Sequence, residues 1–193
     1  KAAVEAVRKG ELDEAVVDES VRRILKIIFK AQQTPKGGEF DQEAHHQLAG
    51  KIASEGMVLL KNNGLLPLKG QRKIAVIGRG AKSPHFQGGG SSHVNPTKVS
   101  IPLEELEKTA SDIEFSYSEG YPKGEDFRQD LIDAAVAEAV SADAAILFIA
   151  LPTYIESEGY DRQNIDLTQQ QVALIKAVAK AQPNSVVVLN NGA

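Results

Sequence analysis

The sequence has 193 residues, of which 42% are hydrophobic and 25% charged, the composition of an ordinary globular protein. Its formal net charge of −4 offers no basic surface for nucleic acid, and no apolar run approaches the ~20 residues that cross a bilayer. Because there is no cysteine, disulfides, thiolate metal ligands and cysteine nucleophiles are excluded together. The same absence fits a reducing compartment, so the cytoplasm is the expected location.

The two ends of the sequence suggest a piece of a longer polypeptide. The sequence begins at Lys1 within a helical pattern, without a start methionine, and it stops at Ala193 soon after a strand-like run. We therefore expect further chain on both sides. The lack of a targeting segment then says nothing about the parent protein.

Residues 1–70 are predicted to be helical. Asp13 is expected to cap a helix that extends to about residue 32, because apolar residues recur there at helical spacing. These apolar residues share one face: Val17, Val21, Ile24, Leu25 and Ile28. The opposite face is basic, and such a face is either a partner surface or, more often, simply solvated. Asp41 is expected to cap a second helix.

Strands and helices alternate from residue 73 onwards. Apolar runs predict strands at residues 74–77, 113–117, 144–150 and 185–189, with 113–117 alternating like an edge strand. Helical patterns begin near Pro102, Asp126 and Thr168, and Thr168 forms a capping box with Gln171. This alternation predicts an α/β fold in which helices sandwich a mainly parallel sheet.

Two kinds of ligand site are rejected from the sequence. Gly78 and Gly80 follow the first predicted strand, but Pro84 and the absence of a following helix disagree with a dinucleotide fingerprint. The histidines have no metal-ligand spacing: His45 and His46 are adjacent on a helix, and His85 and His93 are separated in a loop. We expect neither a cofactor nor a metal.

A glycine loop is the first unusual feature. Gly88, Gly89 and Gly90 precede Ser91, and three consecutive glycines allow the backbone to approach another surface closely. Such a loop either wraps a ligand or another domain, or is a mobile surface loop.

Two carboxylates follow the most apolar strand. Glu156 and Glu158 alternate on the loop after residues 144–150, so on an extended chain both would face one cleft. A carboxylic acid that donates a proton at neutral pH needs a raised pKa, from burial or from a second negative charge. Either the loop carries acid chemistry or it is a charged surface loop, and no partner nucleophile is evident in the sequence.

Several segments resemble motifs of glycoside hydrolase family 3. Residues 53–68 are similar to its LLKN-x-x-LPL signature, and residues 73–78 to the strand that opens its second domain. The glycine loop is similar to its GGGS loop, residues 158–162 to its EGYDR motif, and residues 186–192 to its VVVL-x-x-G ending. The resemblance spans nearly the whole sequence, with the motifs in the family order.

The resemblance implies a two-domain β-glucosidase-like enzyme. Residues 1–32 would be the helical end of a (β/α)8-type barrel domain, residues 33–70 the link, and residues 71–193 a truncated α/β sandwich domain. The family's nucleophile is a barrel aspartate, and no aspartate here lies in a matching motif. The isolated piece is therefore expected to be inactive without its barrel.

The implied chemistry is retaining hydrolysis of a β-glycoside by two carboxyl groups. Glu158 would be the general acid/base, because it stands directly before Gly-Tyr-Asp-Arg in the family motif. Glu156 is the runner-up, since the register of this loop varies. Asp161 and Arg162 are expected to hold the loop through an ion pair. Gly88, Gly89, Gly90 and Ser91 are a possible sugar-binding loop.

A non-catalytic α/β sugar-binding or docking module is the alternative. The expected partners are a β-glucoside-like carbohydrate and the missing barrel domain, with no nucleic acid and no membrane. Because the apolar stripe on the helix at residues 13–32 would lack its barrel, the piece is also expected to self-associate.

Overall fold

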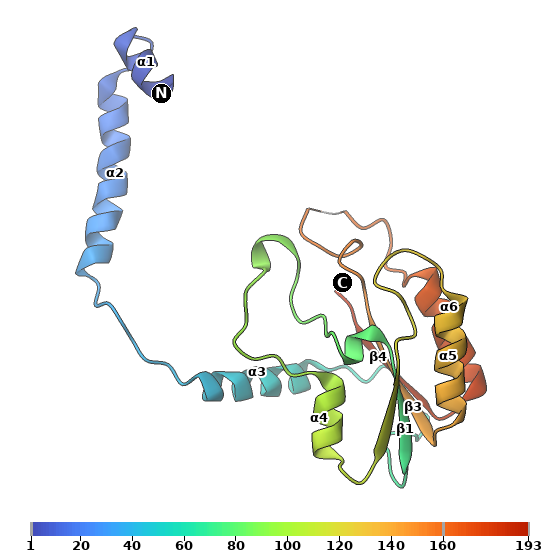
Figure 1. Ribbon diagram of the computed structural model, residues 1–193. Coiled ribbons are helices and arrows are strands. Elements are labelled where there is room, and N and C mark those ends of the chain that lie inside the picture. The colour runs from blue at the N-terminus through green and yellow to red at the C-terminus, as the bar shows by residue number, and fades with distance from the viewer. Residues whose placement is uncertain (1, 160, 193) are drawn as a thin grey trace. The chain divides into compact units, whose positions relative to one another are not determined.

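The computed structural model describes residues 2–159 and 161–192, which divide into two compact units, Lys1–Met57 and Val58–Ala193 (Figure 1). The boundary falls within the stretch predicted as the link. Within the described residues, no helix is both long enough and apolar enough to span a membrane.

The first unit contains three helices, α1 (Ala2–Arg8), α2 (Glu14–Gln33) and α3 (Gln42–Gly56). Both predicted caps are confirmed: Asp13 accepts a hydrogen bond from the Ala15 N–H, and Asp41 accepts one from the Ala44 N–H, each at 2.9 Å. None of the helical residues is buried. The apolar face of α2 is therefore not buried within this unit.

The second unit is built on a four-stranded parallel sheet in the order β2-β1-β3-β4. Its elements are β1 (Lys73–Ile77), η1 (Arg79–Ala81), η2 (Gly90–Ser92), α4 (Pro102–Thr109), β2 (Glu114–Ser118), α5 (Gln129–Val140), β3 (Ala144–Ala150), α6 (Gln169–Ala181) and β4 (Ser185–Asn190). The expected parallel α/β fold is confirmed, and the alternating strand, β2, lies at an edge of the sheet.

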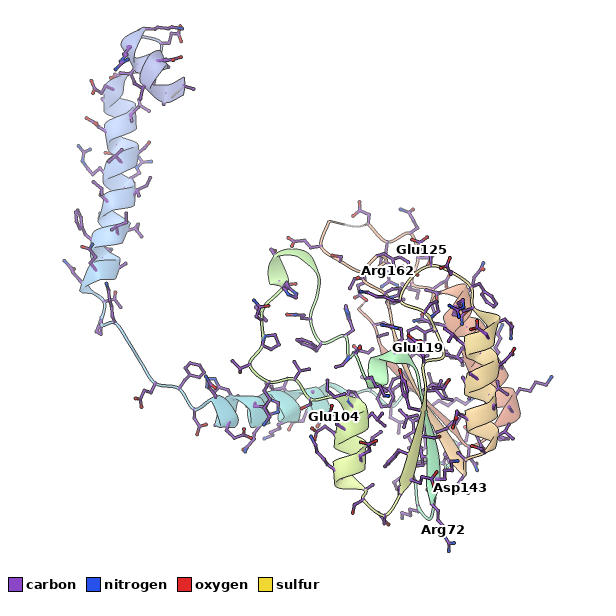
Figure 2. The ribbon with its side chains drawn as sticks, in the orientation of Figure 1. Arg72, Glu104, Glu119, Glu125, Asp143 and Arg162 are labelled. Atoms are coloured by element: carbon purple, nitrogen blue, oxygen red, sulfur yellow. The ribbon has the colours of Figure 1, made fainter. Side chains whose placement is uncertain are left out.

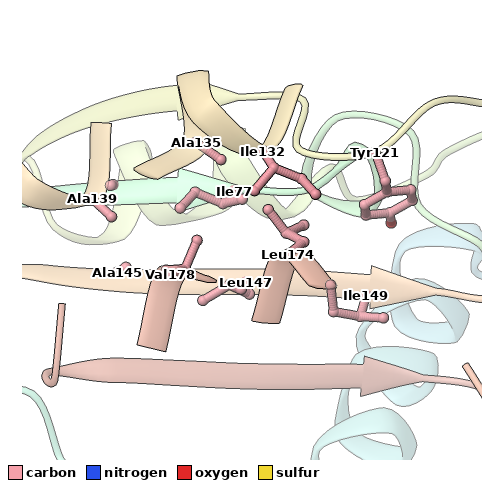
Figure 3. Close-up of a cluster of buried hydrophobic side chains, with 11 residues drawn as sticks. Ile77, Tyr121, Ile132, Ala135, Ala139, Ala145, Leu147, Ile149, Leu174 and Val178 are labelled. Carbon is pink, nitrogen blue, oxygen red and sulfur yellow. The ribbon is translucent and has the colours of Figure 1, made fainter. Parts of the chain in front are cut away.

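Helices cover both faces of the sheet because alternate residues of each strand point to opposite sides. Helices α5 and α6 pack over Ile77, Leu147 and Ile149 on one face, with Leu174 of α6 fully buried between them (Figure 3). Helix α4 covers Val76 on the other face. The two apolar clusters hold β1 and β3 at the centre of the unit.

The chain leaves β1 and β3 in opposite directions across the sheet. From β1 it passes to β2 on one side, and from β3 it passes to β4 on the other. The loops after β1 and β3 therefore begin side by side and then run towards opposite sides of the sheet. Parallel α/β proteins place their ligand sites at such a point. Figure 1 shows both loops rising from the same end of the sheet.

Tyr121 joins these strand ends from the loop after β2. Its hydroxyl donates to the Phe148 carbonyl at 3.0 Å and accepts from the Gly80 and Ala150 N–H groups at 3.3 Å. Gly78 contributes by its lack of a side chain, because a Cβ there would collide with the Phe148 carbonyl. Gly78 and Gly80 thus serve packing against β3.

Candidate functional site

The glycine loop after β1 meets the loop after β3 at the carboxyl edge of the sheet. The backbone N–H of Ser91 donates a hydrogen bond to Oε2 of Glu158 at 2.5 Å. These residues lie 67 positions apart in the sequence. The two features singled out from the sequence therefore form one structural site.

The glycines are required by this close approach. A Cβ on Gly89 would overlap the side chain of Ser157, and one on Gly90 would lie 2.6 Å from Cβ of Glu158. Gly90 also has φ of +73°, a conformation that side chains disfavour. The glycine run is explained by contact with the carboxylate loop, and its possible role in sugar binding remains a prediction.

Glu158 is exposed, and its contacts favour the ionised form. Hydrogen bonds from the side chain of Ser91 and then from its backbone N–H hold the pKa of Glu158 below its ordinary value. This shift is opposite to the one expected for a proton donor. It follows from the donors on Ser91, whose effect exceeds the opposing effect of burial, and no second negative charge is among the causes.

Glu156 lies in different surroundings. It is half-buried, and its Oε2 is buried with no hydrogen-bond partner among the described residues. Its carboxylate lies beside Gly192, where an added Cβ would come within 2.8 Å of Cδ of Glu156. The two glutamates therefore do not face one cleft in this structure.

The loop after β3 turns instead of running extended. The N–H groups of Ile155 and Glu156 both donate to the Pro152 carbonyl, at 2.9 and 3.1 Å. The expectation that alternate residues point the same way is wrong here, because it applies only to extended backbone. Turns and bends continue to residue 159, and Glu156 and Glu158 contact different segments, at Gly192 and at Ser91.

Arg162 reaches the segment that follows β4. Its Nη1 donates to the Gly192 carbonyl at 3.5 Å, and its Nε is buried without a hydrogen-bond partner among the described residues (Figure 2). The expected Asp161–Arg162 ion pair is absent from the part of the chain that the structure describes. Arg162 thus connects this loop to the chain after β4.

Asn190 and Gly192 belong to the site although sequence reasoning assigned them no role. Asn190 donates from Nδ2 to the His85 carbonyl at 2.6 Å, which ties the end of β4 to the loop after β1. Gly192 contacts Glu156 and Arg162 as described above. Their position in the VVVL-x-x-G motif was the signal, but its meaning depends on loops distant in the sequence.

A hollow lies beside the start of α6 and the loop that precedes α5. It has a volume of about 200 Å³ and is bounded by Tyr121, Phe127, Tyr154 and Gln170, among others. Gln170 is satisfied within the protein, because its side chain bonds Gly120 and Arg128. Among the described residues no cluster of histidines and carboxylates could hold a metal ion.

The chain is similar to known glycoside hydrolases. Residues 57–193 match the family model described as the glycosyl hydrolase family 3 C-terminal domain. The chain is 45% identical over 196 residues to the thermostable beta-glucosidase B of Acetivibrio thermocellus, covering 100% of this chain and 26% of that protein. It is 36% identical over 202 residues to an exo-alpha-(1->6)-L-arabinopyranosidase of Bifidobacterium longum, covering 98% of this chain and 26% of that protein.

Solved structures agree with these similarities. A GH3 beta-glucosidase of Bifidobacterium adolescentis has a TM-score of 0.75 and 36% identity, over 97% of this chain and 28% of that one. The beta-glucosidase DesR of Streptomyces venezuelae, in complex with D-glucose, has a TM-score of 0.81 and 25% identity, over 100% and 38%. The chain spans about a quarter of the length of the curated relatives it matches.

Proposed function

Since the chain belongs to glycosyl hydrolase family 3 and contains its C-terminal domain, we propose that it supplies the acid/base loop of a retaining β-glycosidase. The remainder of the parent enzyme would provide the barrel and the nucleophile. The observation that carries the proposal is the placement of Glu158. It stands in the Glu-Gly-Tyr-Asp-Arg motif, is exposed at the carboxyl edge of the sheet, and is contacted by the glycine loop.

Glu158 fits the acid/base role better than Glu156 does. A general acid/base must reach a substrate oxygen and a water molecule, and the exposed Glu158 can do so. Glu156 is half-buried beside Gly192, so its carboxylate belongs to the packing between loops. The structure supports Glu158 for catalysis and Glu156 for loop structure.

The proposed reaction has two steps. In the first, the nucleophile attacks the anomeric carbon while Glu158 gives its proton to the departing oxygen. In the second, Glu158 takes a proton from water, whose oxygen bonds to the anomeric carbon as the nucleophile leaves with its electron pair. A bound sugar and a neighbouring carboxylate would raise the pKa of Glu158 for the first step, because both disfavour its charged form.

The substrate class proposed is a β-glucoside. This assignment draws on relatives described as beta-glucosidases, including the 45% identical protein of Acetivibrio thermocellus. An arabinopyranosidase is also among the relatives, so the sugar pocket is expected to depend on parts of the parent outside this chain.

The test compares Glu158→Ala with Glu156→Ala in the full-length enzyme, on aryl β-glucosides with good and poor leaving groups. Loss of the acid should slow poor leaving groups by about 10²–10⁴-fold and good ones far less. Added azide should restore turnover of Glu158→Ala and give a glycosyl azide of retained configuration. The proposal requires this behaviour from Glu158→Ala and its absence from Glu156→Ala.

Other outcomes have definite meanings. The reverse pattern would keep the glycosidase function and move the acid/base to Glu156. If neither substitution alters turnover, the loop has a structural role and the domain is a sugar-binding or docking module.

A further inference from the structure

The contact between the glycine loop and Glu158 has a role beyond the fold. We infer that Ser91 is a positioning residue for the acid/base: its backbone N–H holds the Glu158 carboxylate at the edge of the site, with its hydroxyl beside it. Gly89 and Gly90 are small so that Ser91 can come close enough to do this. The inference rests on the proposed function, because it assigns a partner to the proposed acid/base residue.

The geometry limits where the carboxylate can lie. The Ser91 N–H donates to Oε2 of Glu158 at 2.5 Å, and the Ser91 hydroxyl is the first of the groups that lower the pKa of the same side chain. Gly90 lies against Cβ of Glu158 and Gly89 against Ser157, so the loop contacts the carboxylate and its neighbour together. Substrate would meet a carboxylate whose position is set by the Ser91 N–H and by contact with Gly90, instead of a freely rotating side chain.

The glycine loop also has internal bonds that involve neither Ser91 nor Glu158. Ser92 donates from its hydroxyl to the Gly89 carbonyl at 3.0 Å. Gln87 accepts a bond from the Val94 N–H at 2.9 Å and donates to the Val94 carbonyl at 3.2 Å, closing the base of the loop. These bonds act without touching Glu158, so they provide control positions for the experiment.

No charged group accounts for the ionisation of Glu158. The described titratable side chains on the loops after β1 and β3 include His85, His93, Glu156, Asp161 and Arg162. None of them is among the causes that lower the pKa of Glu158, which are the two Ser91 hydrogen bonds. The state of this carboxylate therefore depends on Ser91.

The contact favours one half of the catalytic cycle. Donors that stabilise a carboxylate stabilise the form that accepts a proton from water in the second step. They oppose the protonated form that is required in the first step. Ser91 is therefore expected to matter most when release of the sugar from the nucleophile limits turnover.

The first experiment follows the ionisation of Glu158 itself, in the 193-residue chain. The side-chain carboxyl of Glu158 is titrated by carbon-13 NMR in the wild type and in Ser91→Ala, Ser91→Thr and Ser92→Ala. Ser91→Ala should raise the pKa of Glu158 towards its ordinary value, because the first of the two influences of Ser91 that lower it is lost while the N–H bond remains. Ser91→Thr keeps a hydroxyl and should leave the pKa near that of the wild type, as should Ser92→Ala.

A second variant moves the loop without removing the hydroxyl. In Gly90→Ala the new Cβ collides with Glu158, so the contact should open and the pKa of Glu158 should rise. Gly124→Ala is the matched control, because a Cβ there meets nothing within 4 Å. An unchanged pKa of Glu158 in both Ser91→Ala and Gly90→Ala would overturn the inference.

The second experiment tests the consequence in the full-length enzyme. A dinitrophenyl β-glucoside has a good leaving group, so the second step limits turnover. The acid limb of the plot of kcat against pH then reports the pKa of Glu158 as the base. Ser91→Ala should move this limb to higher pH, and Ser91→Thr should restore it. If Ser91→Ala raised the pKa of Glu158 but left the acid limb of the kcat–pH profile unchanged, the positioning role would be overturned.

The two proposals can fail separately. If Glu158→Ala lacks the acid/base signature while Ser91→Ala still raises the pKa of Glu158, the contact is real but the proposed function is wrong. If Glu158→Ala shows that signature and Ser91→Ala changes neither the pKa nor the profile, the function stands and the role of Ser91 does not.

Discussion

Gly192 determines where the side chain of Glu156 can lie. The carboxylate of Glu156 occupies the space that a Cβ on residue 192 would need. In Gly192→Ala, Glu156 has to turn away, and the buried position of its Oε2 is lost. We expect Gly192→Ala to lower the free energy of unfolding in the wild type but much less in a Glu156→Ala background.

A double-mutant cycle measures this coupling. Residues in direct contact typically show interaction energies of about 0.5–3 kcal/mol, and the low end is expected here because the colliding group is a flexible carboxylate. The free energies of unfolding of the wild type, both single variants and the double variant supply the cycle. Equal losses from Gly192→Ala in the two backgrounds would show that Gly192 and Glu156 do not interact.

At this scale the sequence predicts the functional residues better than their partners. Glu158 and the glycine run can be recognised from local motifs, because catalytic groups and tight approaches require particular residue types. The contacts Ser91–Glu158 and Gly192–Glu156 join distant segments, and no local pattern encodes them. The assumption of an extended loop failed because the turn at Pro152 depends on backbone bonds within the loop.

Among the elements, Tyr121 links the loop after β2 to the ends of β1 and β3. Tyr121→Phe would remove the donor to the Phe148 carbonyl and leave the buried N–H groups of Gly80 and Ala150 without this acceptor. Unsatisfied buried groups cost about 1–3 kcal/mol, so a loss of this size in the free energy of unfolding is expected. Urea unfolding should show a lower midpoint with an unchanged slope.

Tyr154→Phe provides the control for this substitution. Tyr154 is 36% exposed and, among the described residues, makes no such set of bonds to strand ends, so its change should be within about 0.5 kcal/mol. If Tyr121→Phe were as stable as Tyr154→Phe, the hydroxyl of Tyr121 would not be joining the strands.

Asp143 joins the beginnings of β1 and β3 at the opposite edge of the sheet. Its Oδ2 accepts hydrogen bonds from the backbone N–H groups of Arg72 at 2.8 Å and Lys73 at 3.0 Å (Figure 2). The bond from Arg72, and after it the bond from Lys73, hold the pKa of Asp143 below its ordinary value. The folded protein therefore keeps this carboxylate ionised at pH values where the unfolded chain would bind a proton.

This linkage gives a pH dependence of stability. Because the folded pKa of Asp143 lies below the unfolded one, its contribution is present above the unfolded pKa and is lost as pH falls through the folded pKa. Asp143→Asn should lower Tm at neutral pH and make Tm fall less steeply on acidification. Asp112→Asn, at another exposed aspartate, should keep the wild-type acid dependence; identical curves for all three proteins would contradict this role.

The helix starts show why the presence of a helix is easier to predict than the residue at which it begins. The caps at Asp13, Asp41 and Thr168 are local signals, and the structure contains all three. The helix predicted to start near Asp126 begins as α5 at Gln129. The bond from the Arg128 N–H to Oε1 of Gln170 holds the chain just before this start, and it comes from a helix 42 residues away.

At the scale of the whole molecule, the two units differ in what they bury. The second unit has buried apolar clusters on both faces of its sheet. The first unit has no buried residue in any of its helices, although α2 carries an apolar stripe. In that stripe Ile24 is 62% exposed, and Val21 and Ile28 are 46% and 44% exposed. Helical periodicity predicted this stripe, but periodicity alone does not reveal what covers it.

An exposed stripe of this kind is expected to associate in the 193-residue chain. Sedimentation velocity should show a concentration-dependent increase in sedimentation coefficient for the wild type, because association removes apolar surface from water. Replacing both Ile24 and Ile28 by Glu should shift the protein towards monomer at the same concentration. Lys26→Glu changes the net charge by the same −2 on the basic side of α2 and should leave association unchanged.

A wild type that sediments as a monomer at all concentrations, with α2 helical by NMR, would show that an uncovered stripe is tolerated. Equal loss of association in Lys26→Glu would instead assign the effect to charge, since only the isoleucine substitutions remove apolar surface.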